Sequence, residues 1–155
     1  ELIEAISPKY FSDKKRTTAI LSVSNILNSL LPDSQSNKTI YKSLENFYKN
    51  LELDNWIVLY IFWELNLIKE LGFGLDLEKF NEKGLKDDEI LRINLDNQDY
   101  EIPYFLITKK IPKSISSITI RKSLSFTRFI FQNKFFLPNS LIFPRTRVLL
   151  ENYFI

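Results

Sequence analysis

The sequence predicts a mainly α fold, a compact helical bundle of about five helices with a small β-hairpin insertion. Several segments carry apolar residues at the spacing of about 3.6 residues that a helix requires. Residues 89–102 instead alternate apolar and polar residues, which is typical of strands. The chain of 155 residues holds only three glycines, all between residues 72 and 84, and two of them lie where a helical pattern stops.

The first helix is expected from about Asp13 to Leu31. Ser12 or Asp13 can cap its N-terminus, and Pro32 closes it because proline disfavours a helical residue before it. Its apolar residues recur at helical spacing: Ile20, Val23, Leu27 and Leu30.

A second helix is expected after the polar loop "PDSQSN", with Ser36 or Asn37 as its cap. Steps of one and three residues give it an amphipathic stripe. The stripe consists of Ile40, Tyr41, Leu44, Phe47, Tyr48 and Leu51.

The third helix, "NWIVLYIFWELNLIKEL", is apolar on most sides, with Asp54 as its expected cap. Such a helix lies at the centre of a bundle, covered by the others, so we interpret Trp56 and Trp63 as core residues. Glu64 interrupts the apolar surface and is expected to make a buried or half-buried hydrogen bond. The segment is too short and too charged to favour a membrane span.

The sequence "LGFG" should end this third helix. Gly72 can adopt the left-handed conformation that satisfies the last helical carbonyls, Phe73 can fold back onto the helix, and Gly74 permits a second bend. No strand precedes the glycines and no Lys-Ser/Thr follows them, so the pattern is not a nucleotide-binding loop.

The sequence after the third helix predicts a hairpin with its turn at "DNQD", followed by a proline-punctuated connector "IPYFLITKKIPKS". A fourth helix is expected over residues 118–136 and is ended by Pro138. A last helix is expected to begin near Pro144. At about 100° per residue, four polar residues of the fourth helix fall within roughly 40° of one another. This polar stripe consists of Arg121, Ser125, Arg128 and Gln132, with phenylalanines on both sides.

The composition excludes several kinds of site. Without Cys or His, the chain has no disulfide, thiolate zinc site, cysteine nucleophile or histidine-based triad. We read Asp87, Asp88 and Glu89 as a solvated turn, because consecutive acids do not converge on one ion. No constellation supports catalysis, so we expect a protein that is not an enzyme and has no cofactor.

The net charge of +2 hides an asymmetry. Residues 1–102 carry 12 Lys/Arg and 18 Asp/Glu, whereas residues 103–155 carry 9 Lys/Arg and a single acid, Glu151. The basic last third can attract phosphates or acidic peptides. Alternatively, it complements the acidic first part within the folded domain.

The segment "WELNLIKELGFGLDLEKF" resembles the helix-to-loop segment of the bacterial recombination mediator family RecO. Members of that family show an aromatic-Glu-Leu pair, then Leu-Gly-Tyr/Phe-Gly and an apolar-Asp-Leu run. Upstream, "ILNSLLPDSQSNKTIYKSLENFYKNL" is similar to its paired helices, and downstream "SFTRFIF" and "FPRTRVLL" are similar to its closing helices. The resemblance covers most of the chain from about Ala19 to Leu150.

The resemblance implies a domain division with two departures from the family. Residues 1–12 would be the exit from an N-terminal oligonucleotide-binding barrel that this chain lacks, so we expect a fragment of a longer protein. Residues 13–155 would be the helical C-terminal domain, with the hairpin insertion at about residues 80–112. The four-Cys zinc site of many members is lost, and the hairpin would be held by packing alone.

The resemblance also implies a function in DNA repair, DNA damage and recombination. Family members load recombinase onto single-stranded DNA coated with single-stranded DNA-binding protein (SSB), anneal strands, and bind the acidic, Phe-ended SSB tail. Expected partners are therefore single-stranded DNA, the SSB tail and RecR, the last through the missing barrel. The expected location is cytoplasmic and nucleoid-associated, with no membrane.

The candidate residues for binding DNA and the SSB tail lie in the basic last third. Arg121 and Arg128 are first, with Phe129 or Phe131 beside them as an apolar pocket. We expect both arginines to be exposed and dispensable for folding. The further candidates are Arg145, Arg147, Lys122 and Lys134.

Two other functions fit the same sequence. One is a purely structural helical module that docks a partner protein and has no nucleic-acid role. The other is a small-molecule regulator that uses an apolar cavity between helices. A steep salt dependence of single-stranded DNA binding would favour the role in DNA repair and recombination over the docking module.

Overall fold

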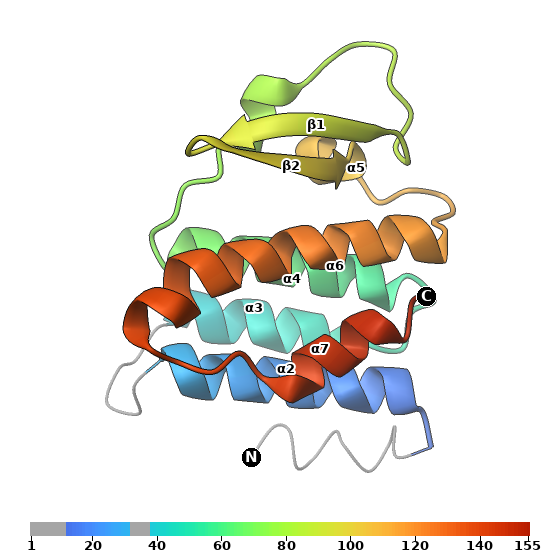
Figure 1. Ribbon diagram of the computed structural model, residues 1–155. Coiled ribbons are helices and arrows are strands. Elements are labelled where there is room, and N and C mark those ends of the chain that lie inside the picture. The colour runs from blue at the N-terminus through green and yellow to red at the C-terminus, as the bar shows by residue number, and fades with distance from the viewer. Residues whose placement is uncertain (1–11, 32–37) are drawn as a thin grey trace.

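The computed structural model describes residues 12–31 and 38–155. Its main elements are five helices and one hairpin (Figure 1): α2 (Lys14–Leu30), α3 (Lys38–Lys49), α4 (Trp56–Glu70), β1 (Ile90–Leu95), β2 (Gln98–Pro103), α6 (Ser117–Phe131) and α7 (Arg145–Asn152). Shorter turns of helix are η2 (Leu77–Phe80), α5 (Phe105–Thr108), η3 (Gln132–Phe136) and η4 (Leu137–Asn139). The predicted mainly α fold is confirmed.

Some expectations concern residues outside the described part of the chain. These are the exit segment before Ser12, the closure of the first helix by Pro32, and the capping of the second by Ser36 or Asn37.

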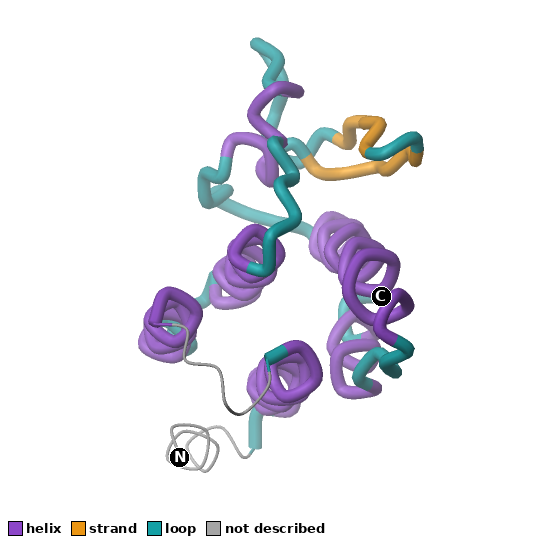
Figure 2. Tube along the Cα trace, turned by 90° about the vertical axis from the view of Figure 1, so that its left-hand side faces the viewer, coloured by secondary structure: helices purple, strands orange, loops and turns teal. Residues whose placement is uncertain are grey.

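Helix α4 is the central helix, as its apolar sequence predicts. It packs against α3 and α6, while α2 packs against α7 and β2 lies against α6. In Figure 2 the helices are seen nearly end-on, with both strands outside the group of helices on one side. Trp56 and Trp63 are buried in the core, as predicted.

The first helix starts as predicted, but two details of the next two helices were predicted wrongly. Asp13 caps α2 by accepting a hydrogen bond from the backbone N–H of Arg16 at 3.1 Å. Asn55, not Asp54, occupies the cap position of α4, and it makes no capping side-chain bond. Tyr41 is exposed although its stripe neighbours are buried.

The end of α4 has the geometry that the glycine predicts. Gly72 has a φ of +100°. Its N–H donates to the Lys69 carbonyl at 3.0 Å, and the N–H of Phe73 donates to the Ile68 carbonyl at 3.2 Å, which is the Schellman pattern. Phe73 packs against the core. Gly74 shows no positive φ, so the second bend does not depend on left-handed backbone there.

The hairpin forms with its turn inside the predicted segment "DNQD", as two residues between β1 and β2. Asp96 and Asn97 both have positive φ, at 51° and 64°, as a type I′ turn requires. The antiparallel register pairs Ile93 with Tyr100 and Leu91 with Ile102. Tyr100 packs edge-on against Phe126 of α6, with ring centroids 5.3 Å apart, and this contact seats the hairpin on the bundle.

Packing alone does not hold the hairpin module, contrary to the expectation. The Tyr104 hydroxyl bonds to the Asn81 side chain and to the backbone carbonyl of Glu82. Lys134 of η3 pairs with Asp96 at the hairpin turn at 2.7 Å. Polar links therefore tie the module to its own loop and to the bundle.

The connector after β2 also differs from its prediction. Phe105, Leu106 and Ile107 form the helix α5 and are buried in the core. Pro103 and Pro112 indicated a connector, but the apolar residues between them are enough for one helical turn, and burying them stabilises it.

Candidate functional site

A network of charged and polar side chains crosses the interior of the bundle. At its centre is Glu64 of α4, which is fully buried. One oxygen of its carboxylate accepts from the Tyr60 hydroxyl at 2.8 Å and from Arg147 Nε at 2.6 Å. The other accepts from Thr127 Oγ1 at 2.7 Å and from Arg147 Nη2 at 3.0 Å. The predicted buried hydrogen bond of Glu64 is confirmed.

Arg147 of α7 is the main partner of Glu64 and is itself fully buried. Besides the carboxylate, its Nη2 donates to the Leu124 carbonyl at 2.8 Å and to Thr127 at 3.0 Å. Since Tyr60 gives its single hydrogen to Glu64, Ser22 of α2 is the donor in the 2.8 Å Ser22–Tyr60 bond. The network thus joins α2, α4, α6 and α7.

A second carboxylate extends the network toward the surface. Glu151 of α7 accepts two bonds from Arg128 of α6, from Nε at 2.9 Å and from Nη2 at 3.1 Å. It also accepts from Ser125 at 3.0 Å and lies 3.4 Å from Arg147 Nη1. The side chains of Arg128 and Glu151 are 23% and 7% exposed, so Ser125 and Arg128 of the polar stripe face α7 rather than open solvent.

The network shifts the pKa of several members. Burial by itself would raise the pKa of Glu151, but the hydrogen bond from Arg128 and the charges of Arg147 and Arg128 outweigh it and lower that pKa below 4.5. Burial and the charge of Glu64 raise the pKa of the Tyr60 hydroxyl. Burial opposes the charge of Arg147, yet Glu64 raises its pKa.

The structure separates the candidate binding residues into two groups. Arg147 and Phe131 are fully buried, so neither presents a side chain to a ligand, contrary to the expectation. Arg128 is half-buried and already bound by Glu151, so it is not the dispensable exposed arginine that the sequence indicated. Its guanidinium also lies 4.6 Å from the ring centre of Phe129, which is 41% exposed.

The other candidates are more accessible. Arg121 is half-buried and Arg145 exposed, and neither makes an ion pair with a described residue. Lys122 lies 4.0 Å from Glu101 of β2. Lys134 pairs with Asp96 and lies 5.1 Å from the ring centre of Phe73.

The basic last third is partly neutralised by the acidic first part. Four of its cations pair with acids before residue 103: Lys109 with Glu78, Lys122 with Glu101, Lys134 with Asp96, and Arg147 with Glu64. This is the internal complementarity that the sequence left open as an alternative. Arg121 and Arg145 remain outside it.

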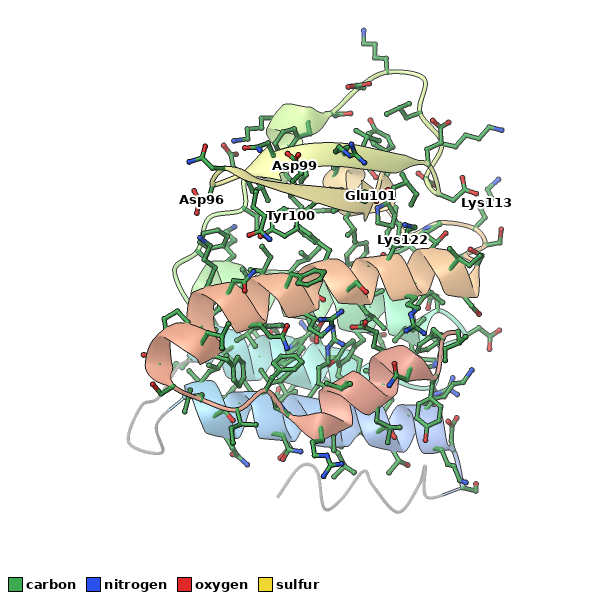
Figure 3. All side chains as sticks on the ribbon, viewed as in Figure 1. Asp96, Asp99, Tyr100, Glu101, Lys113 and Lys122 are labelled. Atoms are coloured by element: carbon green, nitrogen blue, oxygen red, sulfur yellow. The ribbon has the colours of Figure 1, made fainter. Side chains whose placement is uncertain are left out.

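A cleft of about 580 Å³ opens between the hairpin and α6. Figure 3 shows Glu101 of β2 and Lys122 of α6 in the space between these two elements. The lining includes Arg92, Asp99, Glu101, Lys122, Phe126 and Phe129. Sequence reasoning missed the hairpin side of this cleft, because it depends on β2 packing against α6.

A second pocket, of about 670 Å³, lies between α4 and the loop after it. Its apolar part is formed by Phe62, Leu65, Leu75 and Leu77. Gly74 lies at this pocket, and a Cβ there would meet no atom within 4 Å. Its lining also includes Asn66, Lys69, Asp76, Glu78 and Lys109, so the pocket is only partly the apolar cavity that a small-molecule regulator would need.

The described residues contain neither a cluster of metal ligands nor a membrane-spanning helix. Over 12–31 and 38–155, no three acidic side chains gather as a metal site would need. No helix in that part of the chain has the length and apolar character needed to cross a bilayer.

Comparison with known proteins identifies the family. A family model described as "Recombination protein O C terminal" matches residues 12–91, about half of the chain. The candidate residues from Arg121 to Arg147 lie outside this match. No solved structure matches.

Curated relatives carry the name "DNA repair protein RecO". That of Ehrlichia chaffeensis is 37% identical over 81 residues, which cover 51% of this chain and 33% of the relative. That of Wolbachia pipientis subsp. Culex pipiens is 36% identical over 90 residues, covering 57% and 37%. That of Anaplasma marginale is 30% identical over 89 residues, covering 57% and 37%. The matches thus span about a third of the length of these relatives. This chain belongs to the family of the RecO C-terminal domain.

Proposed function

We propose that this domain acts in DNA repair and recombination as part of a mediator. The mediator helps load recombinase onto single-stranded DNA coated with SSB and anneals complementary strands. It does so by binding DNA and the acidic SSB tail, and it is not an enzyme. Membership of the family and the names of the relatives support this role. Binding of RecR and a cytoplasmic, nucleoid-associated location are also part of the proposal.

One observation carries the proposal to particular residues. Of the six basic candidates in the last third, only Arg121 and Arg145 lack an ion pair with any residue in the described ranges. A cation without a fixed partner can contact a phosphate or a peptide carboxylate without first breaking an internal bond. We therefore assign these two arginines the first contacts, with Lys122 and Lys134 as weaker ones.

The exposed ring of Phe129 is the apolar part of the proposed tail site. Arg128 lies against this ring, and its half-exposed guanidinium can be shared between Glu151 and a peptide carboxylate. A tail that ends in phenylalanine would place its own ring beside Phe129, where burial of both is favourable. Phe131 has no part in this site because it is buried.

The test is binding of single-stranded DNA and of an acidic, Phe-ended peptide over a salt series. We expect affinity for DNA to fall steeply with salt, because counterions are released. The double variant Arg121→Ala/Arg145→Ala should reduce the slope by about 1.4, since each phosphate contact on a single strand contributes about 0.7. Its thermal melt should match that of the wild type.

The alternative is a structural docking module with no nucleic-acid role. Four ion pairs between the basic third and the acidic first part favour it, because they use the positive charge inside the fold. It predicts no salt-dependent DNA binding and no effect of the double variant on ligand affinity. That result would overturn the proposed function.

A further inference from the structure

The cleft between β2 and α6 differs in chemistry from the polar stripe beside it. Its volume of about 580 Å³ is within the range of small-ligand sites. On α6 its lining residues include Lys122, Phe126 and Phe129, which are spaced at three and four residues and so share one face. Phe126 is buried under Tyr100 as the floor.

Phe129 gives the cleft a surface for stacking. Its ring is 41% exposed and also lines the cleft. Arg128 lies over the ring at 4.6 Å from its centre, and Glu151 fixes that arginine. An aromatic ring held in this way is a platform on which an unstacked base can lie, since every base has a π-face.

The rim of the cleft carries both signs of charge. Arg92 and Lys122 are positive, and Asp99 and Glu101 are negative. The Lys122–Glu101 pair is loose, at 4.0 Å with side chains 39% and 55% exposed, so each partner can take a new one. An acidic peptide would satisfy the cations but would be repelled by both carboxylates. A nucleotide satisfies both, because its phosphate is an anion and its base carries N–H donors.

We propose that this cleft binds one unstacked base of single-stranded DNA. The base stacks on Phe129, a phosphate lies near Arg92 or Lys122, and an amino group of the base donates to Asp99 or Glu101. The proposal rests on the proposed DNA-binding function and adds a base preference to it. Cytosine, which has an amino group, is bound more tightly than thymine, which has none.

The test compares fluorescently labelled oligo-dC and oligo-dT of equal length, titrated with the whole chain at pH 7.5 and fixed salt. We expect the wild type to bind oligo-dC about tenfold more tightly, the lower end of what a good base contact contributes. The double variant Asp99→Ala/Glu101→Ala should lose this preference without binding oligo-dT more weakly. Removal of two carboxylates that only repelled DNA would instead raise both affinities equally.

The stacking surface has its own variant and control. Phe129→Leu should weaken binding of both oligonucleotides about tenfold, because one base–ring stack is lost. Ile118→Ala removes an exposed apolar side chain from the same helix outside the cleft, and it should leave both affinities unchanged. Equal losses in the two variants would overturn the assignment of Phe129.

The possible failures are distinguishable. If the wild type binds neither oligonucleotide, the DNA-binding function and this inference fall together. If it binds both equally, or if the preference survives in Asp99→Ala/Glu101→Ala, only the base site is overturned. Because the proposed tail site shares the ring of Phe129, an acidic peptide and oligo-dC should compete for the protein, and simultaneous binding of both would overturn the assignment of that ring to the base.

Discussion

The interior of the bundle and the cleft beside the hairpin each hold an ion pair that joins the acidic first part of the chain to the basic last third. Glu64 and Arg147 meet at 2.6 Å with both side chains fully buried. Glu101 and Lys122 are 4.0 Å apart and largely exposed. The first pair is completed by hydrogen bonds on every side, whereas the second is open to water and to ligands. The difference teaches that the buried charges are committed to the fold, whereas the exposed charges are available for the binding that we propose.

The largest expected effect is at Arg147. Arg147→Met leaves the Glu64 carboxylate buried without its cation, and loss of one partner of a buried pair costs about 3–5 kcal/mol of unfolding free energy. Chemical denaturation measures this loss. Arg145→Met, two residues away on the exposed side of α7, is the matched control and should change stability by less than about 0.5 kcal/mol. Similar losses in the two variants would remove the contrast.

A smaller effect is expected at Glu151, where it depends on pH. The folded state lowers this pKa below 4.5, so the stabilisation is complete above that value and is lost as pH falls through the lower folded pKa. The wild type should therefore lose stability between about pH 5 and pH 2. Glu151→Gln should start less stable and lose less over the same range. Parallel pH profiles for the two proteins would contradict the role of Glu151.

Gly72 lies at the junction between the helical bundle and the hairpin module, because it ends α4 where the chain leaves the bundle. A side chain at its φ of +100° should cost about 1–2 kcal/mol, so Gly72→Ala should melt earlier than the wild type. Gly74→Ala is the matched control, since Gly74 shows no positive φ and a Cβ there would meet no atom within 4 Å. Equal melting of the two variants would mean that the helix end tolerates a β-carbon.

The smallest effect is expected at the link between η3 and the hairpin turn. Lys134 is half-buried, but its partner Asp96 is exposed, so Lys134→Ala should cost only about 0.2–1 kcal/mol. High salt should weaken the wild type by a similar amount while leaving the variant unchanged. Hydrogen exchange at the amides of β1 and β2 detects the change locally. An effect as large as that at Arg147 would show that the exposed links are structural as well.

Local patterns predicted much of the fold. The cap at Asp13, the end of α4 at Gly72 and the turn at Asp96-Asn97 each depend on a few neighbouring residues, and the structure confirms all three. Periodicity also placed α4 at the centre. Two predictions were wrong: Asp54 as the cap of α4, and a connector without a helix where α5 lies. In both places tertiary packing, rather than local preference, selects the structure.

The candidate site was predicted less well, because it depends on contacts between distant segments. The helical spacing of about 100° per residue placed Arg121 and Arg128 on one stripe, but it could not show that Glu151 of α7 would cover Arg128. One available signal went unused: a lone carboxylate in an apolar central helix needs a cation, and Arg147 and Glu151 are spaced for one face of α7. The cleft was out of reach, since its two sides are 20 to 40 residues apart.

Arginine side-chain NMR tests the division of charge most directly. The chain has six arginines, and each Nε–H gives its own signal. We predict that the signal of Arg147 exchanges slowly with water and does not move when single-stranded DNA or salt is added. The signals of Arg92, Arg121 and Arg145 should exchange fast and shift on DNA addition. Fast exchange at Arg147, or DNA-dependent shifts there with none at Arg121 and Arg145, would contradict the account.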